Sequence, residues 1–357
     1  MTKAPIKLLM AASGTGGHLF PAIALAQQLP DYQIEWLGVP NRLETRLVPK
    51  EYKLHTISVE GFQKGFGFSS LFTLGKLAGS VLDVRKLLKA GNFQGVITTG
   101  GYIAGPSTIA ARSLGLPVIL HESNAFPGKV TRVFAPWCTS VALGFNVAAQ
   151  YLPKAKTVYL GTPVRPEFRQ PEIGASLDLP VPEGAPLIVV FGGSQGAVAI
   201  NKLVRQSAPA WFDAGAYIVH LTGDNDPEAE SLQHEKYISL PFYDNMAALL
   251  QRANLAISRS GAGSLTELAV CGTPAILIPY PYAAEDHQTY NAQVFTSVDA
   301  GLMFKQSDLT AESLQNEVLK LLCSPLELKT MGEKASSIAI PDSAEKMAKL
   351  VRSLVGK

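Results

Sequence analysis

The chain has 357 residues, a length that suggests about two domains of ordinary size. Hydrophobic residues make up 47% and charged residues only 17%, which argues against disorder and supplies apolar material for two cores. The formal net charge of +2 argues against a general nucleic-acid binder. Three widely spaced cysteines provide neither a disulfide framework nor a CxxC metal site, so we expect a reducing compartment, the cytoplasm.

Short apolar runs alternate with helical patterns along the whole chain, which is typical of α/β folds with parallel sheets. In the first half, the predicted strands are 6–12, 33–37, 95–98, 117–120, 140–143 and 157–160. The helices predicted there are 21–29, 77–90 and 106–114. In the second half, strands are predicted at 187–191, 217–221, 236–239, 255–258 and 275–279. Helices follow at 196–208, 244–251, 264–271 and 286–300, and several more after residue 310.

The two halves repeat one plan, because each opens with a strand, a glycine loop and a helix. The proline-rich stretch 161–186 lacks periodicity and predicts an interdomain linker. We therefore expect two Rossmann-like, doubly wound domains facing a cleft at the carboxyl ends of their strands. The first domain would span 1–163 and the second 164–340, with a C-terminal helix, 341–357, packing back on the first domain.

Four glycine loops, 14–17, 100–105, 192–196 and 261–263, occur at matching points, two in each half. Backbone amides exposed by glycine at a helix N-terminus form an anion site, so the loops together predict a phosphate-bearing ligand. The dinucleotide fingerprint G-x-G-x-x-G fails in both halves and the Walker A pattern is absent, which disfavours a hydride-transfer enzyme or an NTPase. Glu35 lies near the position of the acidic residue in that fingerprint, but it also fits an edge strand.

The sequence Asp224-Asn225-Asp226 reads as D-x-D, which binds a metal and a diphosphate in one fold of glycosyltransferases, but Pro227 makes a simple turn the better interpretation. The glycine amides and Arg165 already supply positive potential. We therefore expect no obligatory bound metal and no other cofactor.

Seven motifs occur in one order: GTGGHLFPA (14–22), GGYIAGP (100–106), HESNAFPGKVTR (121–132), GTPVR (161–165), GGSQGA (192–197), RSGAGSLTELA (259–269) and DHQTYNA (286–292). Together they resemble the MurG family of bacterial enzymes. The resemblance implies a GT-B fold and inverting transfer of N-acetylglucosamine from its UDP derivative to undecaprenyl-diphospho-N-acetylmuramoyl-pentapeptide in peptidoglycan synthesis. It also implies a peripheral enzyme on the cytoplasmic face of the bacterial inner membrane. Two alternatives stay open, a UDP-N-acetylglucosamine epimerase on the same fold and a non-catalytic, two-lobed protein that binds UDP-sugars.

The resemblance assigns binding of the UDP-sugar donor to Thr15, Gly16, Gly17, Asn124, Arg165, Ser194, Tyr243, Ala262, Gly263, Ser264, Leu265, Thr266, Glu267 and Gln288. Tyr243 would act through its backbone, which would contact the uracil edge. Glu267 has a second interpretation, stabilisation of the first turn of its helix by the helix dipole. The two oxygens of a carboxylate suit the vicinal hydroxyls of ribose, and with Arg259 and 286–292 nearby we favour the ribose role.

His18 follows the first glycine loop and is our candidate for the base that accepts the proton of the acceptor hydroxyl. A role in orienting the acceptor or the diphosphate is the alternative. His121 and Glu122 are second candidates for the base. With Gly100, Gly101 and Tyr102 they are also candidates for contacts with the acceptor or its diphosphate.

The segment 62–89 carries a local charge of +4 and several aromatic residues, so it predicts a docking surface for anionic membranes. Lys64, Phe66, Phe68 and Phe72 are the residues we expect at the lipid surface. The alternative is an ordinary helix, because Leu77, Val81, Val84 and Leu88 recur at helical spacing and would face the core.

Overall fold

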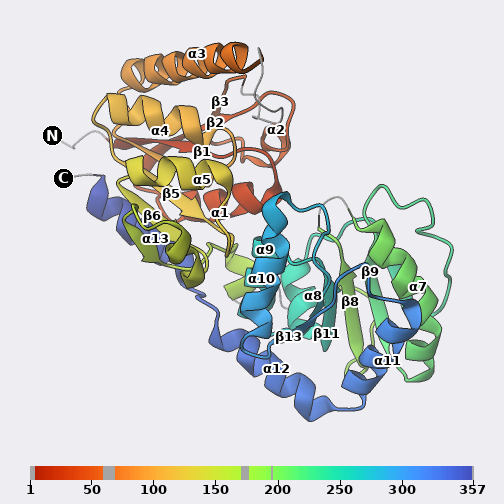
Figure 1. The fold of residues 1–357 in the computed structure, drawn as a ribbon. Helices are drawn as coiled ribbons and strands as arrows, with labels where there is room; N and C mark the ends of the chain where they lie inside the picture. Colours follow the sequence, from red (N-terminus) through yellow and green to blue (C-terminus); the bar gives the residue numbers. More distant parts are fainter. Residues whose placement is uncertain (1–4, 59–68, 170–176, 194–195, 356–357) are drawn as a thin grey trace. The chain divides into compact units, whose positions relative to one another are not determined.

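The alternating pattern folds into two parallel sheets, each with helices on both faces, in a computed structural model (Figure 1). The structure describes residues 5–58, 69–169, 177–193 and 196–355. Unit 1 comprises Met1–Arg165 and Ile340–Lys357, and unit 2 comprises Pro166–Ala339. The predicted α/β class with two doubly wound domains is confirmed.

The sheet of unit 1 has seven parallel strands in the order β3-β2-β1-β4-β5-β6-β7. The strands are β1 (Ile6–Ala11), β2 (Tyr32–Gly38), β3 (Lys53–Thr56), β4 (Gly95–Thr98), β5 (Val118–Glu122), β6 (Ser140–Leu143) and β7 (Thr157–Tyr159). Both faces are buried, because alternate residues of β1 enter different cores: Leu9 packs in one and Leu8 in the other.

Helices of unit 1 cover the sheet on both sides (Figure 1). They are α1 (Gly16–Gln27), α2 (Glu44–Leu47), α3 (Ser69–Ala90), α4 (Ala104–Ser113), α5 (Lys129–Phe134), η1 (Ala135–Trp137), η2 (Asn146–Tyr151) and α13 (Ser343–Leu354). Val84 and Leu88 of α3 are buried in the core with Leu9, as their helical spacing predicted. Met347 of α13 packs in the core with Leu8, so the C-terminal helix belongs to unit 1.

The sheet of unit 2 has six parallel strands in the order β10-β9-β8-β11-β12-β13. The strands are β8 (Leu187–Phe191), β9 (Tyr217–Leu221), β10 (Tyr237–Leu240), β11 (Leu255–Ser258), β12 (Ala275–Leu277) and β13 (Gly301–Met303). The helices are α6 (Pro166–Arg169), α7 (Val198–Asp213), α8 (Met246–Arg252), α9 (Ala262–Cys271), η3 (Ala284–Asp286), α10 (His287–Thr296), α11 (Ala311–Leu322) and α12 (Pro325–Ser337). Trp211 of α7 is fully buried in the core on one face of this sheet.

The prediction of an interdomain linker at 161–186 was wrong for most of that stretch. Unit 2 already begins at Pro166, the first residue of α6, and Phe168 in that helix is buried. Arg252 of α8 donates hydrogen bonds to the carbonyl oxygens of Pro182 and Ala185, which fixes the end of the stretch on unit 2. Proline suits the first turn of a helix, so a proline-rich stretch need not be a linker.

In both sheets, the strand order reverses between two strands that are each followed by a glycine loop. In unit 1 the strand order reverses between β1 and β4, and in unit 2 it reverses between β8 and β11. All four predicted glycine loops directly follow these four strands. Ligands of doubly wound sheets bind outside the carboxyl ends of the strands at such a switch point, so each unit presents one candidate site.

Candidate active site

The first glycine loop of unit 1 joins β1 to α1, which begins at Gly16, five residues earlier than predicted. Gly14 has a φ of +105°, a left-handed conformation that favours glycine. His18 lies in the first turn of α1, half-buried, with its Nδ1 3.2 Å from the carbonyl oxygen of Ser13. Because a carbonyl only accepts, Nδ1 of the neutral ring carries the proton and Nε2 carries the lone pair.

The loop after β4 packs against the same imidazole ring. Gly100 and Gly101 have φ values of +95° and +74°. A Cβ atom on Gly100 would lie 3.5 Å from Nε2 of His18, and one on Gly101 would lie 3.6 Å from Nδ1. The two loops therefore bring His18, Gly100 and Gly101 together, whereas Tyr102 is 37% exposed.

A fully buried carboxylate, Glu44, holds the first glycine loop from behind. Its Oε2 accepts the N–H of Gly14 at 3.3 Å, and its Oε1 accepts the N–H of Val39 at 2.7 Å. Gly38 makes room for it, since a Cβ there would lie 2.6 Å from Cγ of Glu44. Sequence reasoning missed this residue, because a glutamate in a short polar segment looks like a surface side chain.

The two second candidates for the base are buried and anchor loops. His121 is fully buried in β5, with Nε2 3.2 Å from the carbonyl oxygen of Gly161, and burial lowers its pKa to about 4. Glu122 accepts the backbone N–H of Asn124 at 2.9 Å, its side-chain amide at 3.0 Å, and the N–H of Gly128 at 3.1 Å. This arrangement favours His18 over both as the group that meets a substrate.

Arg165, the last residue of the first segment of unit 1, lies beside α1. Its guanidinium carbon is 5.1 Å from the centroid of the Phe20 ring. A Cβ on Gly16 would lie 2.9 Å from the same ring, so Gly16 is needed where Phe20 packs against the start of the helix. Arg165 is thereby placed near the N-terminal turns of α1.

In unit 2, the loop after β8 approaches the loop after β9 closely. Gly196 has a φ of +72°, and a Cβ there would lie 2.3 Å from the carbonyl oxygen of Thr222. Only glycine permits this approach. Ser194, the predicted diphosphate ligand of this loop, lies outside the described residues.

The D-x-D sequence forms a structural ion pair. Asp226 is buried and accepts hydrogen bonds from Arg205 at 2.7 and 3.2 Å and from Asn201 at 2.7 Å. Burial alone would raise the pKa of Asp226, but Arg205 and Asn201 lower it overall. No group of three or more His, Cys, Asp or Glu within the described part of the chain is arranged to hold a metal ion.

The N-terminus of α9 follows β11 without a side-chain cap. The helix begins at Ala262, two residues earlier than predicted, and Gly261 occupies the capping position. The amides of Ala262, Gly263 and Ser264 therefore point out of the first turn, where an anion binds readily. Leu265 is buried in the core, and the Thr266 hydroxyl donates to the carbonyl of Ala262 at 2.9 Å.

Glu267 lies in the second turn of α9 and is half-buried. The interpretation as first-turn stabilisation is therefore wrong, because α9 has no acidic residue in its first turn and the dipole effect fades beyond it. The ribose role stays a prediction.

A buried arginine precedes this helix. The guanidinium of Arg259 donates to the carbonyl oxygens of Ile278 and Pro279 at 3.1 Å and to Oε1 of Gln306 at 2.6 Å. The side chain is 8% exposed, and burial lowers its pKa. These partners carry no formal charge, so a positive charge remains near the N-terminus of α9.

The segment 286–292 is tied to the same loop. The hydroxyl of Ser260 donates to the carbonyl of Gln288 at 2.7 Å, and the side-chain amide of Asn291 donates to the carbonyl of Ser260 at 3.1 Å. Oε1 of Gln288 accepts the N–H of Tyr280 at 2.9 Å. Two predicted donor-binding motifs are therefore adjacent, and Gln288 is held in place by its neighbours.

Three further residues of unit 2 belong to, or directly precede, the predicted donor-binding positions. Glu285 and Asp286, just before α10, have φ values of 53° and 55°, a strained conformation for residues other than glycine. Tyr243 donates a hydrogen bond to Asp178, and burial together with that carboxylate raises its pKa to about 12.

Glu35 is neither on an edge strand nor exposed, which corrects the edge-strand interpretation. It lies in β2, the second strand of the sheet, and its carboxylate contacts Nζ of Lys7 at 2.7 Å and Nε2 of His55 at 2.5 Å. Burial would raise the pKa of Glu35, but the two bases lower it overall.

Comparisons with known proteins agree with the motifs. Residues 8–143 match the glycosyltransferase family 28 N-terminal domain, and residues 187–350 match the corresponding C-terminal domain. A protein of Nostoc punctiforme named UDP-N-acetylglucosamine–N-acetylmuramyl-(pentapeptide) pyrophosphoryl-undecaprenol N-acetylglucosamine transferase is 75% identical over 99% of both chains.

Among solved structures, MurG of Acinetobacter baumannii is 28% identical and has a TM-score of 0.79, with 98% of this chain and 100% of that chain covered. A proposed UDP-N-acetylglucosamine 2-epimerase of Listeria monocytogenes covers 98% of this chain and 96% of its own, with a TM-score of 0.69. At 13% identity, that likeness concerns the fold alone. The resemblance to the MurG family is confirmed, and the chain belongs to glycosyltransferase family 28.

Proposed function

We propose that the protein transfers N-acetylglucosamine, with inversion, from UDP-N-acetylglucosamine to the 4-hydroxyl of the muramoyl-pentapeptide carried by undecaprenyl diphosphate. The observation that carries the proposal is the 75% identity, over 99% of both chains, to a relative named for this transfer. The glycine loops at both switch points suit a substrate pair that carries two diphosphates.

His18 is the proposed base. Its Nδ1 donates to the carbonyl of Ser13, so Nε2 has the lone pair that accepts the proton of the acceptor hydroxyl. As that proton leaves, the hydroxyl oxygen bonds to the anomeric carbon and the bond from that carbon to the UDP oxygen breaks. A single displacement of this kind inverts the configuration, and UDP departs with the bonding electrons.

Unit 2 is the proposed site for the nucleotide. The uncapped start of α9 and the buried Arg259 favour an anion, and Glu267 would accept both ribose hydroxyls. Gln288 and the backbone of Tyr243 would complete the contacts with the nucleoside. In unit 1, the donor-binding roles of Thr15, Gly16, Gly17, Asn124 and Arg165 stay predictions, as does that of Ser194 in unit 2.

We also propose that unit 1 docks on the anionic cytoplasmic face of the inner membrane. Lys64, Phe66 and Phe68 lie outside the described residues, and only the backbone of Phe72, in α3, is described. Exposed apolar side chains on described elements support the proposal: Leu82 of α3 is 56% exposed and Trp137 of η1 is 51% exposed. Within the described residues, no helix has the length and apolarity needed to cross a bilayer.

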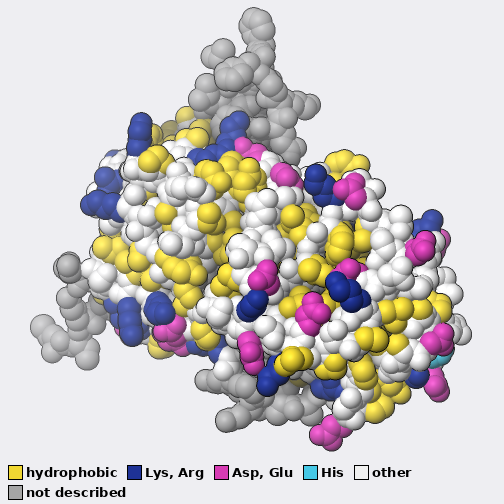
Figure 2. Space-filling model, turned by 60° about the horizontal axis from the view of Figure 1, so that its bottom comes forward, with side chains coloured by type: hydrophobic (Ala, Val, Ile, Leu, Met, Phe, Trp, Pro, Cys, Tyr) yellow, Lys and Arg dark blue, Asp and Glu magenta, His cyan; other side chains and the backbone are white. Residues whose placement is uncertain are grey.

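One face of the protein carries mixed charge. On the face that Figure 2 shows, Lys and Arg side chains are interspersed with Asp and Glu side chains and with apolar ones. This face is therefore not generally basic (Figure 2), in agreement with the net charge of +2.

The test is an assay with radiolabelled UDP-N-acetylglucosamine, with and without the lipid-linked acceptor, repeated in the presence of a chelator. The proposal expects label in the lipid product, and equal transfer after chelation because no obligatory metal is proposed. Isomerised sugar without acceptor would instead identify an epimerase, and unchanged ligand would identify a binding protein.

A further inference from the structure

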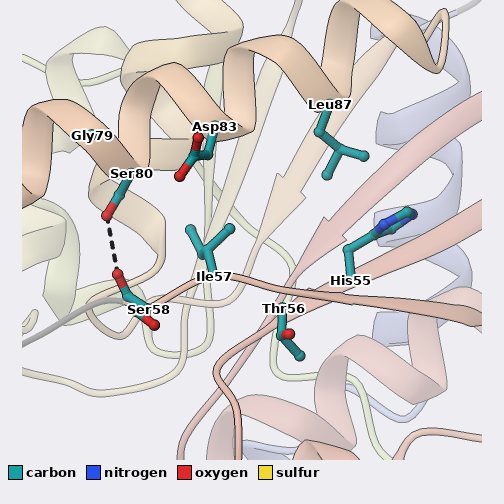
Figure 3. Close-up of a pocket in the computed structure, with 8 residues that line it drawn as sticks. All are labelled: His55, Thr56, Ile57, Ser58, Gly79, Ser80, Asp83 and Leu87. Carbon is teal, nitrogen blue, oxygen red and sulfur yellow. Dashed lines mark hydrogen bonds between the residues drawn. The ribbon is translucent and has the colours of Figure 1, made fainter.

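Unit 1 has a pocket of about 620 Å³ that lies apart from His18 and its glycine loops, between β3 and α3 (Figure 3). Its floor is formed by residues 55–58, at and beyond the carboxyl end of β3. Its roof is one face of α3, which presents Gly79, Ser80, Asp83 and Leu87 at helical spacing. A Cβ on Gly79 would meet no atom within 4 Å, so the absent side chain leaves space in the roof.

The lining combines two apolar side chains, Ile57 and Leu87, with hydroxyl groups, the imidazole of His55 and the carboxylate of Asp83. Figure 3 shows Ile57 pointing up toward α3, and Asp83 and Leu87 pointing down toward the strand. Asp83 is exposed, and the structure gives its carboxylate no ion pair among the described residues. The Ser80 hydroxyl donates to the carbonyl of Ser58 at 3.1 Å and ties the roof to the floor. A carboxylate that is unpaired among the described residues, and that shares the pocket with Ile57 and Leu87, suits a cationic group on an apolar stem.

The strand beneath the pocket has an open edge. β3 is the first strand of the sheet and pairs only with β2 among the described residues. The N–H of Ile57 donates inward to the carbonyl of Gly38 at 3.1 Å. Because successive residues of a strand face opposite sides, the N–H of Thr56 points outward. An extended peptide can pair with such an edge, and its alternate side chains would then enter the pocket.

The pocket also lies at the carboxyl end of the strands, the same end as the glycine loops. Ala11, Leu37 and His55 are register partners across β1, β2 and β3, so His55 in the floor lies two strand spacings, about 10 Å, from Ala11, the last residue of the strand before the first glycine loop. A substrate whose diphosphate and sugar lie at that loop has a peptide within reach of β3 if the peptide extends across the sheet edge.

We propose that this pocket and the edge of β3 bind the peptide of the acceptor in an extended form, with a side-chain ammonium group of that peptide at Asp83. The inference rests on the proposed function, because the relatives are named for a pentapeptide-bearing acceptor. It adds a subsite for the peptide and assigns the acid that selects a cationic side chain.

The test is equilibrium binding, which does not depend on transfer. Fluorescent muramoyl-pentapeptide with one free side-chain amine, and the same compound with that amine acetylated, are titrated with the full-length protein by anisotropy. The variants are Asp83→Asn and, as a matched control, Glu51→Gln, an exposed carboxylate of unit 1 outside the pocket. Thr56→Pro removes the outward N–H without touching the hydrogen bonds to β2.

We expect Asp83→Asn to weaken binding of the free-amine peptide about fivefold, a size typical of an exposed ion pair, and to leave the acetylated peptide unaffected. Glu51→Gln should change neither, and Thr56→Pro should weaken both. Equal affinities of Asp83→Asn and Glu51→Gln for the free-amine peptide would overturn the proposal, as would equal losses with both peptides. A parallel transfer assay on the wild type tests the proposed function separately, since absence of transfer leaves the binding ratio measurable.

Discussion

The carboxyl edges of the two sheets share a topology but differ in the buried charged groups that hold their loops. In unit 1, the loops are held by buried carboxylates: Glu44 accepts the N–H of Gly14, and Glu122 accepts the N–H groups of Asn124 and Gly128. In unit 2, a buried guanidinium, Arg259, lies just after β11 and donates to carbonyl oxygens, and the buried Asp226 after β9 is paired with Arg205.

We propose that this difference separates the two tasks of the reaction between the units. A carboxylate that accepts loop amides removes donors from an anion, and Glu44 adds negative charge behind the loop that precedes His18, which suits a group that must accept a proton. A guanidinium that binds carbonyl oxygens leaves the amides of α9 available and adds positive charge, which suits a diphosphate. We therefore propose that unit 1 accepts the proton and that unit 2 binds the nucleotide.

The largest expected effect tests the assignment in unit 1. His18→Ala should lower kcat for transfer by about 10²–10⁴, because general base catalysis typically contributes that factor. Steady-state kinetics with saturating acceptor provide the measurement. A rise in the KM for UDP-N-acetylglucosamine with unchanged kcat would instead assign His18 to donor binding.

The charge of Arg259 tests the assignment in unit 2. Arg259→Met should weaken UDP binding about tenfold more than Arg259→Lys does, because lysine keeps the positive charge. Both variants lose the planar hydrogen-bonding group. Uridine, which lacks the diphosphate, should bind equally to the two variants. Calorimetric titration of both ligands measures this, and the same tenfold difference for uridine would contradict an electrostatic role.

The carboxylate behind the first glycine loop sharpens the contrast between the units. Glu44→Gln offers only one acceptor oxygen to two buried N–H groups, so it should lower the free energy of unfolding by about 1–3 kcal/mol. It should also lower kcat with little change in the KM for UDP-N-acetylglucosamine. Denaturant unfolding and kinetics are compared with Glu51→Gln, and an unchanged kcat would reduce Glu44 to a purely structural role.

A pH dependence is expected to be common to both units. Burial lowers the pKa of His121 in unit 1 to about 4 and that of His220 in unit 2 to about 3. Both pKa values lie below the unfolded value of about 6.5, so burial of the two neutral imidazoles is fully compatible with folding above that pH. As the pH falls toward 4, the unfolded state takes up protons that the folded state does not, and the protein loses stability.

Scanning calorimetry from pH 8 to pH 5 measures this loss. Replacing His121 by Asn should reduce the slope of unfolding free energy below pH 6 by about 1.4 kcal/mol per pH unit, one proton's worth. An unchanged slope would show that His121 also becomes protonated in the folded state.

Much of this comparison could be predicted from the sequence, because glycine loops after apolar strands have a physical signature. The strands 95–98, 140–143, 187–191, 217–221 and 255–258 were predicted with the bounds that the structure has. The position of His18 beside the first loop followed from sequence adjacency alone. Strands β3 and β13 were missed because each has only three or four residues and a mixed burial pattern.

The rest depends on contacts between distant residues. Glu44 reaches Gly14 across thirty positions, and Glu35 pairs with His55 across twenty, so no local pattern marks either carboxylate as buried. Glu285 and Asp286 adopt left-handed conformations without the glycine that usually indicates them. Side chains that hold functional loops are therefore the part of the site that sequence reasoning finds last.

The affinity of UDP for the matched variants Glu267→Ala and His18→Ala tests the division between the units most directly. Calorimetry should show that Glu267→Ala weakens UDP binding by about 1.5–3 kcal/mol, as expected for the loss of hydrogen bonds to a charged group. The His18→Ala protein should bind UDP with the wild-type affinity. Unchanged UDP affinity in a folded Glu267→Ala protein, together with a loss in His18→Ala, would contradict it and place the nucleotide on unit 1.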